Sequence, residues 1–461
     1  MKINKKIIIA TLNILFILLV VFFTYNYVVS KKNRVKNLEN QILRLQTEID
    51  SIPILKGKIS LGPITEEIFK SKKTNYTLKK IKTSGLTTSK HPGSIGNTYL
   101  DYNNDKLFLA TANGIFSFIN FDEILLENSK LIVISSNIKS LIKDKKFYSR
   151  TAYGIKDLLI HNNKFYISYT NELKKNCYNT SILVANVNVS ELVFKKFFVP
   201  KTCVKMDNKF NEYSPHQSGG KMVPYTKNKI LFSIGEYRFR DHAQDNDIIF
   251  GKIISIDTLK KNYEIISMGH RNPQGLLYDE DQNIILSTEH GPAGGDEINV
   301  NLNPGDKVEN FGWPIASYGE HYKYPGIGNH TGYDVLKIGE KDRDNPKYKR
   351  WPLYKSHKNY GFIEPIKYFT PSIAISEIIL IDPKFNGVKE KQIFVGSMGD
   401  FVEEGDLSLH YFVLSNEFKI IEHDIFQIKE RIRDIVYIET LNKIFLFLES
   451  SASIGVLEAR N

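Results

Sequence analysis

One short phrase recurs along most of this 461-residue chain: a polar turn, often Asn-Lys, followed by three or four apolar residues. Such phrases are typical of a turn that leads into a buried β-strand. Six copies are present, and their first apolar residues are Leu107, Phe165, Ile230, Ile284, Ile393 and Ile444. Four of the five intervals span 51–65 residues, which approximates one four-stranded propeller blade with its loops. The repeat therefore predicts an all-β fold, a six-bladed β-propeller over residues 60–461.

The remaining interval, between Ile284 and Ile393, spans 109 residues. Either one blade lacks the phrase, or one blade contains a large insertion. Residues 291–351 are rich in Gly, Pro, Tyr and His, a composition typical of long functional loops. A β-sandwich is the alternative fold, but a sandwich does not require a repeated phrase.

The N-terminus contains a long apolar segment. Residues 7–29 carry no charge and are flanked by Lys5-Lys6 and Lys31-Lys32. A helix of this length crosses a hydrocarbon core of about 30 Å. We expect residues 1–30 to form a cytoplasmic tip and an uncleaved transmembrane signal anchor, with residues 60–461 on the extracytoplasmic, periplasmic side. A cleaved signal peptide is the alternative, but its apolar stretch would be shorter and would precede a small-residue cleavage site.

Residues 31–53 are expected to form a helical spacer that ends at Pro53. Its apolar residues alternate at spacings of three and four: Val35, Leu38, Ile42, Leu45 and Ile49. This pattern is typical of a coiled-coil seam, and a weak homo-oligomer through residues 35–49 would be favoured by tethering to one membrane. A single amphipathic helix explains the same pattern, and both interpretations stay open.

Charge and cysteine content narrow the functional classes further. The net charge is +11, but the lysines are scattered and no Arg-rich helix or zinc-finger spacing is present, so nucleic acid is not expected as a partner. Cys177 and Cys203 are the only cysteines. In an exported domain they are expected to form a disulfide; the alternative is two buried free thiols.

The residues most typical of a functional site fall in a few motifs. Gly269–Leu276 reads GHRNPQGL, residues 288–299 read TEHGPAGGDEIN, and residues 310–314 read NFGWP. His216–Gly220 lies upstream and the RIRD motif of residues 431–434 lies downstream. In this order the motifs resemble the glucose/sorbosone dehydrogenase family, the soluble aldose dehydrogenases that depend on pyrroloquinoline quinone (PQQ). The resemblance covers roughly residues 150–461.

This resemblance implies oxidation of an aldose, or a related sugar alcohol or aldehyde, with hydride passing to PQQ and electrons then passing to an unidentified acceptor. It implies His216 as general base and Arg271 as a second catalytic residue. The residues expected to bind the cofactor are Arg271, Asn272, Gln274, Arg431 and Arg433. The residue types suit this chemistry, because guanidinium groups pair bidentately with the carboxylates of PQQ. A neutral imidazole can take up the hydroxyl proton.

Calcium is the second cofactor that the resemblance implies. The backbone carbonyls of Gly291 and Pro292 match the family positions that hold the Ca²⁺ beside the quinone, and Ca²⁺ prefers oxygen ligands. A second calcium is implied at Ala316, Tyr318 and Glu320, where Glu replaces the usual Asp.

Several departures keep other functions open. Residues 397–400 lack the lysine with which many relatives contact the quinone, and Ser376-Glu377 replaces the usual Ser-Gly. A non-catalytic propeller that binds a ligand or partner on the same face is therefore an alternative. A calcium-dependent lactonase is a third possibility, but it would not need Arg431 and Arg433.

Overall fold

The computed structural model describes residues 57–460 apart from 73, 84–85, 87–96, 210–211, 322–349 and 400–404, together with a few positions between 24 and 38. The predicted membrane span and helical spacer lie almost entirely outside the described residues. Within the described part of the chain, no helix combines the length and apolar character needed to cross a membrane. Residues 1–56 and 57–461 are separate compact units, and the second contains the features that follow.

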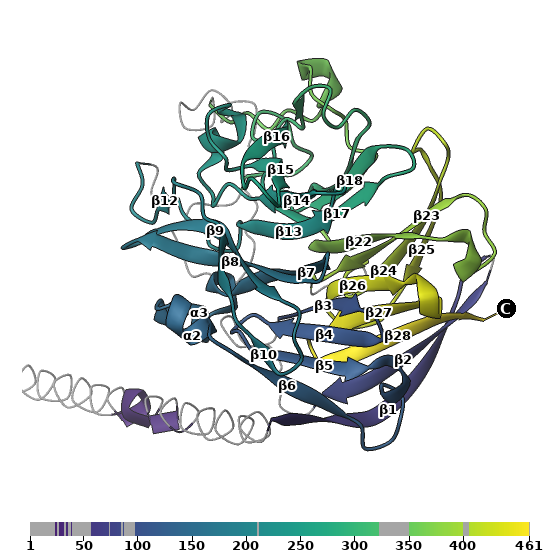
Figure 1. Ribbon diagram of the computed structural model, residues 1–461. Helices are drawn as coiled ribbons and strands as arrows, with labels where there is room; N and C mark the ends of the chain where they lie inside the picture. Colours follow the sequence, from purple (N-terminus) through teal and green to yellow (C-terminus); the bar gives the residue numbers. More distant parts are fainter. Residues whose placement is uncertain are drawn as a thin grey trace, which may run out of the picture. The chain divides into compact units, whose positions relative to one another are not determined.

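Residues 57–460 form six four-stranded antiparallel units and few helices (Figure 1). The first two units contain β3 (Thr98–Asn103), β4 (Lys106–Thr111), β5 (Phe116–Asn120) and β6 (Lys130–Ser136), then β7 (Ile155–His161), β8 (Lys164–Lys174), β9 (Cys177–Asn186) and β11 (Lys195–Phe198). The third and fourth contain β13 (Gly219–Pro224), β14 (Lys229–Ile234), β15 (Lys252–Asp257) and β16 (Tyr263–Met268), then β17 (Pro273–Asp279), β18 (Ile284–Glu289), β19 (Asp296–Asn301) and β21 (Lys367–Phe369). The fifth contains β22 (Ile375–Ile381), β23 (Lys391–Ser397), β24 (Leu409–Leu414) and β25 (Ile420–Phe426). The sixth contains β26 (Ile432–Ile438), β27 (Lys443–Leu448), β28 (Ser453–Arg460) and β2 (Asn75–Thr83).

The first strands of the units contact one another in a closed ring. In order around it, β3 contacts β7, followed by β13, β17, β22 and β26, and β26 returns to β3. Adjacent units pack face to face through aromatic and aliphatic cores. In one such core the Phe108 ring of β4 meets the Phe165 ring of β8 edge to face at 6.0 Å. The arrangement is propeller-like, and each sheet buries both of its faces against its neighbours.

The two ends of the described chain complete the sixth unit together. β2 pairs with the last strand, β28, over eight residue pairs from Asn75↔Arg460 to Lys82↔Ser453. β1 (Lys58–Lys70) then pairs with β2 and also with β6, so it links the sixth unit to the first. The sequence did not predict this closure, because neither strand carries the recurring phrase.

The recurring phrase has one structural position. In all six units it forms the second strand, namely β4, β8, β14, β18, β23 and β27. The apolar residues are buried because these strands lie between two neighbouring sheets. Four of the turn asparagines adopt left-handed backbone conformations, as at Asn104 (φ 54°) and Asn442 (φ 53°), which tight hairpin turns require and Asn tolerates.

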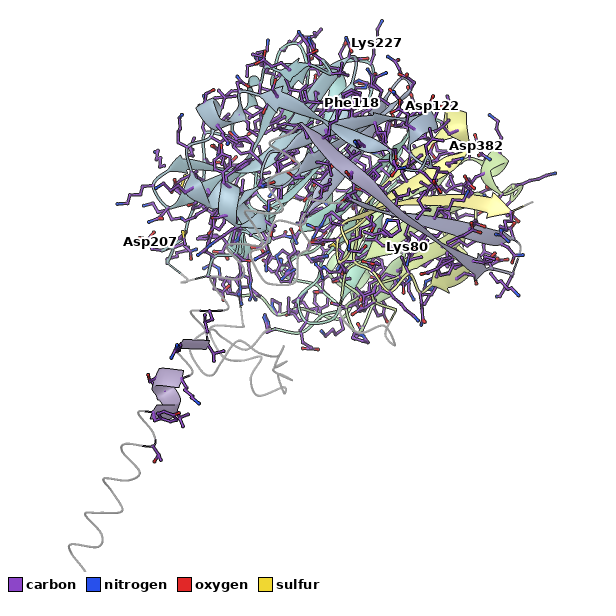
Figure 2. The ribbon with its side chains drawn as sticks, turned by 90° about the horizontal axis from the view of Figure 1, so that it is seen from below. Lys80, Phe118, Asp122, Asp207, Lys227 and Asp382 are labelled. Carbon is purple, nitrogen blue, oxygen red and sulfur yellow. A yellow bond between two sulfur atoms is a disulfide. The ribbon has the colours of Figure 1, made fainter. Side chains whose placement is uncertain are left out.

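The 109-residue interval is an insertion and not a blade without the phrase. Residues 302–366 separate β19 from β21 within the fourth unit, and the short strand β20 (Glu309–Asn310) pairs with β16 of the third unit. Smaller insertions carry α2 (Ile138–Leu141), α3 (Lys145–Ser149), β10 (Glu191–Leu192) and β12 (Val204–Lys205). Exposed charged side chains such as Asp207 and Lys227 lie at the periphery (Figure 2).

Cys177 and Cys203 form a disulfide between the start of β9 and the segment before β12, with a sequence separation of 26 residues. Replacing both by serine is expected to lower the free energy of unfolding by about 3.5 kcal/mol, because the unfolded chain regains the entropy of a loop of this length. Urea unfolding of the variant and the parent measures the loss. Mass spectrometry without reductant provides the check on the premise: two free thiols in the native protein would contradict it.

Candidate functional site

A cavity of about 150 Å³ lies where the first strands of the six units begin. All six units contribute to its lining, which comprises Asn97, Tyr99, Thr151, Ala152, Lys156, Asp157, His216, Ser218, Gly219, Lys221, Gln274, His290, Ser376, Glu377, Met398, Arg431 and Arg433. Four predicted site residues are therefore brought together in one place: His216, Gln274, Arg431 and Arg433.

β-Bulges aim the side chains of this pocket. In five of the six first strands the pairing with the second strand shifts register near the pocket end. The unpaired positions include Lys156, Lys221, Gln274, Glu377 and Arg433, and all of these side chains line the pocket. A bulge inserts one or two extra residues and redirects a side chain. The period-two alternation of a regular strand thus fails where the functional side chains lie.

Arg431 and Arg433 converge on one carboxylate. Arg431 Nε lies 3.2 Å and Arg433 Nη2 lies 3.0 Å from Glu449 Oε2, and Glu449 is buried. Burial opposes ionisation of Glu449, but the two guanidinium groups outweigh it and hold its pKa below the ordinary value. Arg433 Nε is buried and has no hydrogen-bond partner among the described residues. A buried donor without a partner is costly, so this side of the pocket is suited to an anionic ligand.

His216 faces the pocket from the loop that precedes β13. Its ring makes no hydrogen bond with the described residues. Burial lowers its pKa to about 4, and the positive charges of Lys156 and Arg433 contribute. The imidazole is therefore neutral at physiological pH, which is the form that accepts a proton.

Arg271 and Asn272 lie one layer behind the pocket. Arg271 Nη1 donates to the His290 carbonyl at 2.8 Å, and the guanidinium lies 5.4 Å from the Trp313 ring centroid. Asn272 Oδ1 accepts from Gln274 Nε2 at 3.1 Å. Neither side chain is among those that line the cavity. In this structure they position Gln274 and the backbone of His290, and do not face the cavity themselves.

A buried relay of polar groups supports Arg271. The Gln217 amide, in the orientation that satisfies both neighbours, donates to Glu236 at 2.6 Å and accepts from Arg271 at 2.8 Å. Burial raises the pKa of Glu236 to about 8, although Arg271 and Arg240 oppose that shift. The hydrogen bonds through Gln217 therefore hold the guanidinium of Arg271 in a fixed place.

The Gly291 and Pro292 carbonyls follow His290 directly. The Gly291 carbonyl accepts no hydrogen bond from the described residues, and the Pro292 carbonyl accepts only a long one, 3.3 Å, from Ser372 Oγ. Asp296 fixes this turn by accepting from the backbone N–H groups of Gly291 and Ile375. Two carbonyls with spare acceptor capacity are compatible with a Ca²⁺ ion.

The side chains predicted for a second calcium make other contacts in this structure. The Lys355 ammonium lies 2.8 Å from Glu320 Oε1 and also donates to the Gly319 carbonyl, so a cation already neutralises this carboxylate. The Tyr318 hydroxyl donates to Glu364, and the Tyr318 ring stacks on Tyr368 at 3.8 Å. Among the described residues no group of three His, Cys, Asp or Glu side chains is placed to hold a metal.

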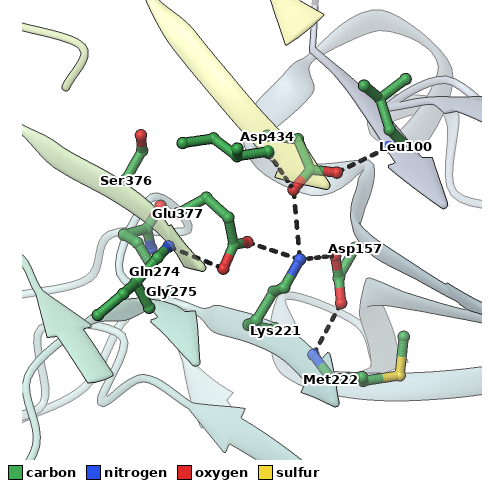
Figure 3. Close-up of polar contacts among 12 residues, drawn as sticks. Leu100, Asp157, Lys221, Met222, Gln274, Gly275, Ser376, Glu377 and Asp434 are labelled. Atoms are coloured by element: carbon green, nitrogen blue, oxygen red, sulfur yellow. Dashed lines mark hydrogen bonds and ion pairs between the residues drawn. The ribbon is translucent and has the colours of Figure 1, made fainter. Parts of the chain in front are cut away.

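Three carboxylates surround one ammonium at the floor of the pocket (Figure 3). Lys221 Nζ lies 2.6 Å from Glu377, 3.0 Å from Asp157 and 3.2 Å from Asp434. The side-chain exposures of Glu377, Asp157 and Asp434 are 4, 0 and 1%. Burial raises the pKa of Asp157 to about 7 and that of Glu377 well above its ordinary value. Burial alone would lower the pKa of Lys221, but the three carboxylates raise it.

Comparison with known proteins shows which family this chain resembles. Residues 127–337 match the family model described as Glucose / Sorbosone dehydrogenase. The predicted resemblance to that family is confirmed. The aldose sugar dehydrogenase YliI of Escherichia coli K12 is 28% identical over 195 residues, which cover 40% of this chain and 45% of the relative. Quinoprotein glucose dehydrogenase B of Acinetobacter calcoaceticus is 41% identical over 83 residues, 17% of this chain and 16% of the relative. The aligned segments thus span less than half the length of these relatives.

Solved structures resemble this chain over a longer stretch. The apo soluble aldose sugar dehydrogenase of Escherichia coli covers 86% of this chain and 99% of its own, with 18% identity and a TM-score of 0.57. The PQQ-bound aldose sugar dehydrogenase of Streptomyces coelicolor covers 86% and 99%, with 14% identity and a TM-score of 0.51. At these low identities, the similarity to glucose/sorbosone dehydrogenase structures shows only that the fold is shared.

Sequence reasoning missed several pocket residues. Lys156, Asp157 and Lys221 line the pocket, and Glu449 pairs with its two arginines, but all four lie outside the motifs identified in the sequence. Only Glu377 gave a signal, because it replaces a glycine that relatives carry. A buried charge in an apolar strand, as in the Ile155–Ile160 segment IKDLLI, was the other available clue.

Proposed function

We propose that this chain is a PQQ- and calcium-dependent aldose dehydrogenase built on a six-bladed β-propeller. The observation that supports this most is the convergence of Arg431, Arg433, Gln274 and His216 on one cavity, where Arg433 Nε has no partner. The donors fit a flat anion that carries several carboxylates, as PQQ does. Bound PQQ would supply the two-electron acceptor that no side chain provides.

The residues of this chain then have distinct roles. Arg431 and Arg433 bind carboxylates of the cofactor, while Gln274 hydrogen-bonds to it and the Gly291 and Pro292 carbonyls hold the Ca²⁺. His216 would take the proton of the substrate hydroxyl while the carbon that bears this hydroxyl gives its hydride to the quinone held by the arginines, so that a C–H bond and an O–H bond break and a C=O bond forms. Arg271 and Asn272 act by positioning His290 and Gln274. A second calcium at Ala316, Tyr318 and Glu320 would have to displace Lys355, which pairs with Glu320.

The N-terminal segment belongs to the same proposal. An uncharged stretch over residues 7–29 with flanking lysines would tether the propeller to a membrane on its extracytoplasmic side. Electrons would then pass to an acceptor in or near that membrane. Cell fractionation with protease protection tests this part separately: a chain that is protected from external protease in spheroplasts and released without detergent would contradict it.

Reconstitution tests the enzyme proposal. The purified full chain is mixed with PQQ and CaCl₂, and quinone absorbance and dye reduction are followed with a panel of aldoses. We expect quinone to bind at micromolar concentration and its absorbance to change when a substrate aldose is added. Omitting calcium is expected to lower turnover, since an ion held by the Gly291 and Pro292 carbonyls would supply the positive charge that polarises a bound quinone.

The alternative, a non-catalytic binding propeller, predicts a different result. It needs the pocket but not a bound quinone, so sugars or other ligands would bind without any dye reduction. Glu377 supports this alternative, because its side chain occupies pocket space that a glycine would leave open. The absence of quinone binding at micromolar concentration would reject the dehydrogenase.

A further inference from the structure

We propose that Lys156 is a cofactor-binding residue whose ammonium pairs with a carboxylate of the quinone, on the wall of the pocket away from Arg431. The inference rests on the proposed function. It begins from position: Lys156 is the bulge residue of β7, between the paired residues Ile155 and Asp157. The bulge directs its side chain into the cavity that His216 and Arg433 also line.

The hydrogen bonds of Lys156 leave capacity for a ligand. Its Nζ donates to the carbonyls of Ala152 at 2.8 Å and Thr151 at 3.2 Å, and both of these residues line the same cavity. An ammonium has three donors, so one remains. Of the described residues, none places a carboxylate within salt-bridge distance of this ammonium. The other pocket lysine differs in this respect, because Lys221 is surrounded by three carboxylates.

On the wall formed by Lys156, Arg431 and Arg433 the positive charges outnumber the one carboxylate, an excess that an anion would correct. Arg431 and Arg433 share the single carboxylate of Glu449. Burial lowers the pKa of Lys156 to about 7, and repulsion from Arg433 adds to that effect. A bound carboxylate would relieve this repulsion and would restore the charge of Lys156, since an opposite charge nearby favours the charged form.

Local packing shows that the position is constrained. Gly220 of β13 lies against Lys156 with a φ of 127°, and a Cβ at Gly220 would lie 2.3 Å from the Cβ of Lys156. Only glycine leaves room for the lysine stem there. Residues 397–400, by contrast, contain no lysine. Lys156 comes from the second unit, opposite the fifth unit to which that segment belongs, and supplies a cation from the other side.

Two measurements test the assignment. Isothermal titration calorimetry of the full chain uses PQQ and, as a redox-inactive anion, benzene-1,3,5-tricarboxylate. Lys156→Met is expected to weaken the binding of both by about ten- to a hundredfold, as expected for loss of one charge-assisted hydrogen bond. Lys156→Arg should retain most of the affinity. Lys164→Met, an exposed lysine on the neighbouring strand β8, is the control and should leave it unchanged.

The second measurement needs no ligand. NMR titration of His216 in the cofactor-free protein should give a higher pKa in Lys156→Met than in the parent, since one nearby positive charge is gone. Unchanged affinities together with an unchanged His216 titration would overturn the assignment while leaving the dehydrogenase proposal intact. If the parent binds the tricarboxylate through Lys156 but not PQQ, the anion site stands and the dehydrogenase proposal fails. If the parent binds neither anion, both are overturned.

Discussion

A Lys221→Met variant is expected to lose about 3–5 kcal/mol of folding free energy, the range measured when one partner of a buried ion pair is removed. The loss arises because Glu377, Asp157 and Asp434 would stay buried without the ammonium that now lies within 3.2 Å of each. Urea or thermal unfolding at pH 8 measures it. Lys229→Met is the matched control: that lysine pairs with Glu264 at the surface, and exposed pairs contribute about 0–1 kcal/mol.

The deficit of Lys221→Met is also expected to depend on pH. The pKa of Asp157 is raised from 3.8 to about 7 in the folded protein, mainly by burial. The folded state therefore binds this proton more tightly than the unfolded chain does, and its stability falls as pH rises between about 4 and 7. Without Lys221 the pKa values of Asp157 and Glu377 rise further, so the deficit should shrink on acidification. Adding Glu377→Gln should recover part of the stability at pH 8.

A loss at pH 8 no larger than that of Lys229→Met would contradict this account of the pocket floor. It would mean that the carboxyl groups are protonated when Lys221 is removed, so that no unpaired negative charge remains buried. In that case Glu377→Gln alone should stabilise the parent protein, because a neutral amide would replace a group that must stay protonated in the fold.

The recurring phrase made the architecture predictable because one strand of each unit is buried on both faces, and a doubly buried strand has a distinctive composition. Phe165 and Ile444 mark such strands. β2 and β28 could not be predicted to pair, because strand pairing between residues 75–83 and 453–460 depends on closing the ring and leaves no local pattern. Composition indicated long loops over residues 291–351 but did not decide between an insertion and a blade without the phrase; the structure shows an insertion between β19 and β21.

The site was predictable only in part, for a related reason. His216, Gln274, Arg431 and Arg433 belong to family motifs, and the structure brings them to one cavity. Arg431 and Arg433 do face the same pocket and share Glu449, although a bulge interrupts the strand pairing at Arg433. Lys156 and Lys221 were not predicted. A single charged residue in an apolar strand does not by itself indicate a binding site, and only the bulges of the folded chain bring these side chains to one pocket.

Replacing His216 by alanine is expected to lower turnover of the PQQ-loaded protein by about 10²–10⁴-fold, the usual contribution of a general base. Quinone binding, measured by absorbance after gel filtration, should persist, because the arginines that would hold the cofactor do not depend on this ring. His161→Ala, at the far end of β7, is the control and should keep full turnover. Retained turnover in His216→Ala would remove the proposed base.

The pH profile separates a base from a merely structural histidine. The neutral ring accepts protons, so kcat/KM should fall as pH decreases through the pKa of His216. That pKa is about 4 in the cofactor-free pocket, where burial, Lys156 and Arg433 lower it. An anion paired with Lys156 and Arg433 would weaken the repulsion between these two cations and protonated His216, and would so raise the pKa of His216. The acid limb of the profile should therefore lie at higher pH than the His216 titration of the cofactor-free protein. In His216→Ala the residual activity should lose that limb, and an unaltered acid limb would assign it to another group.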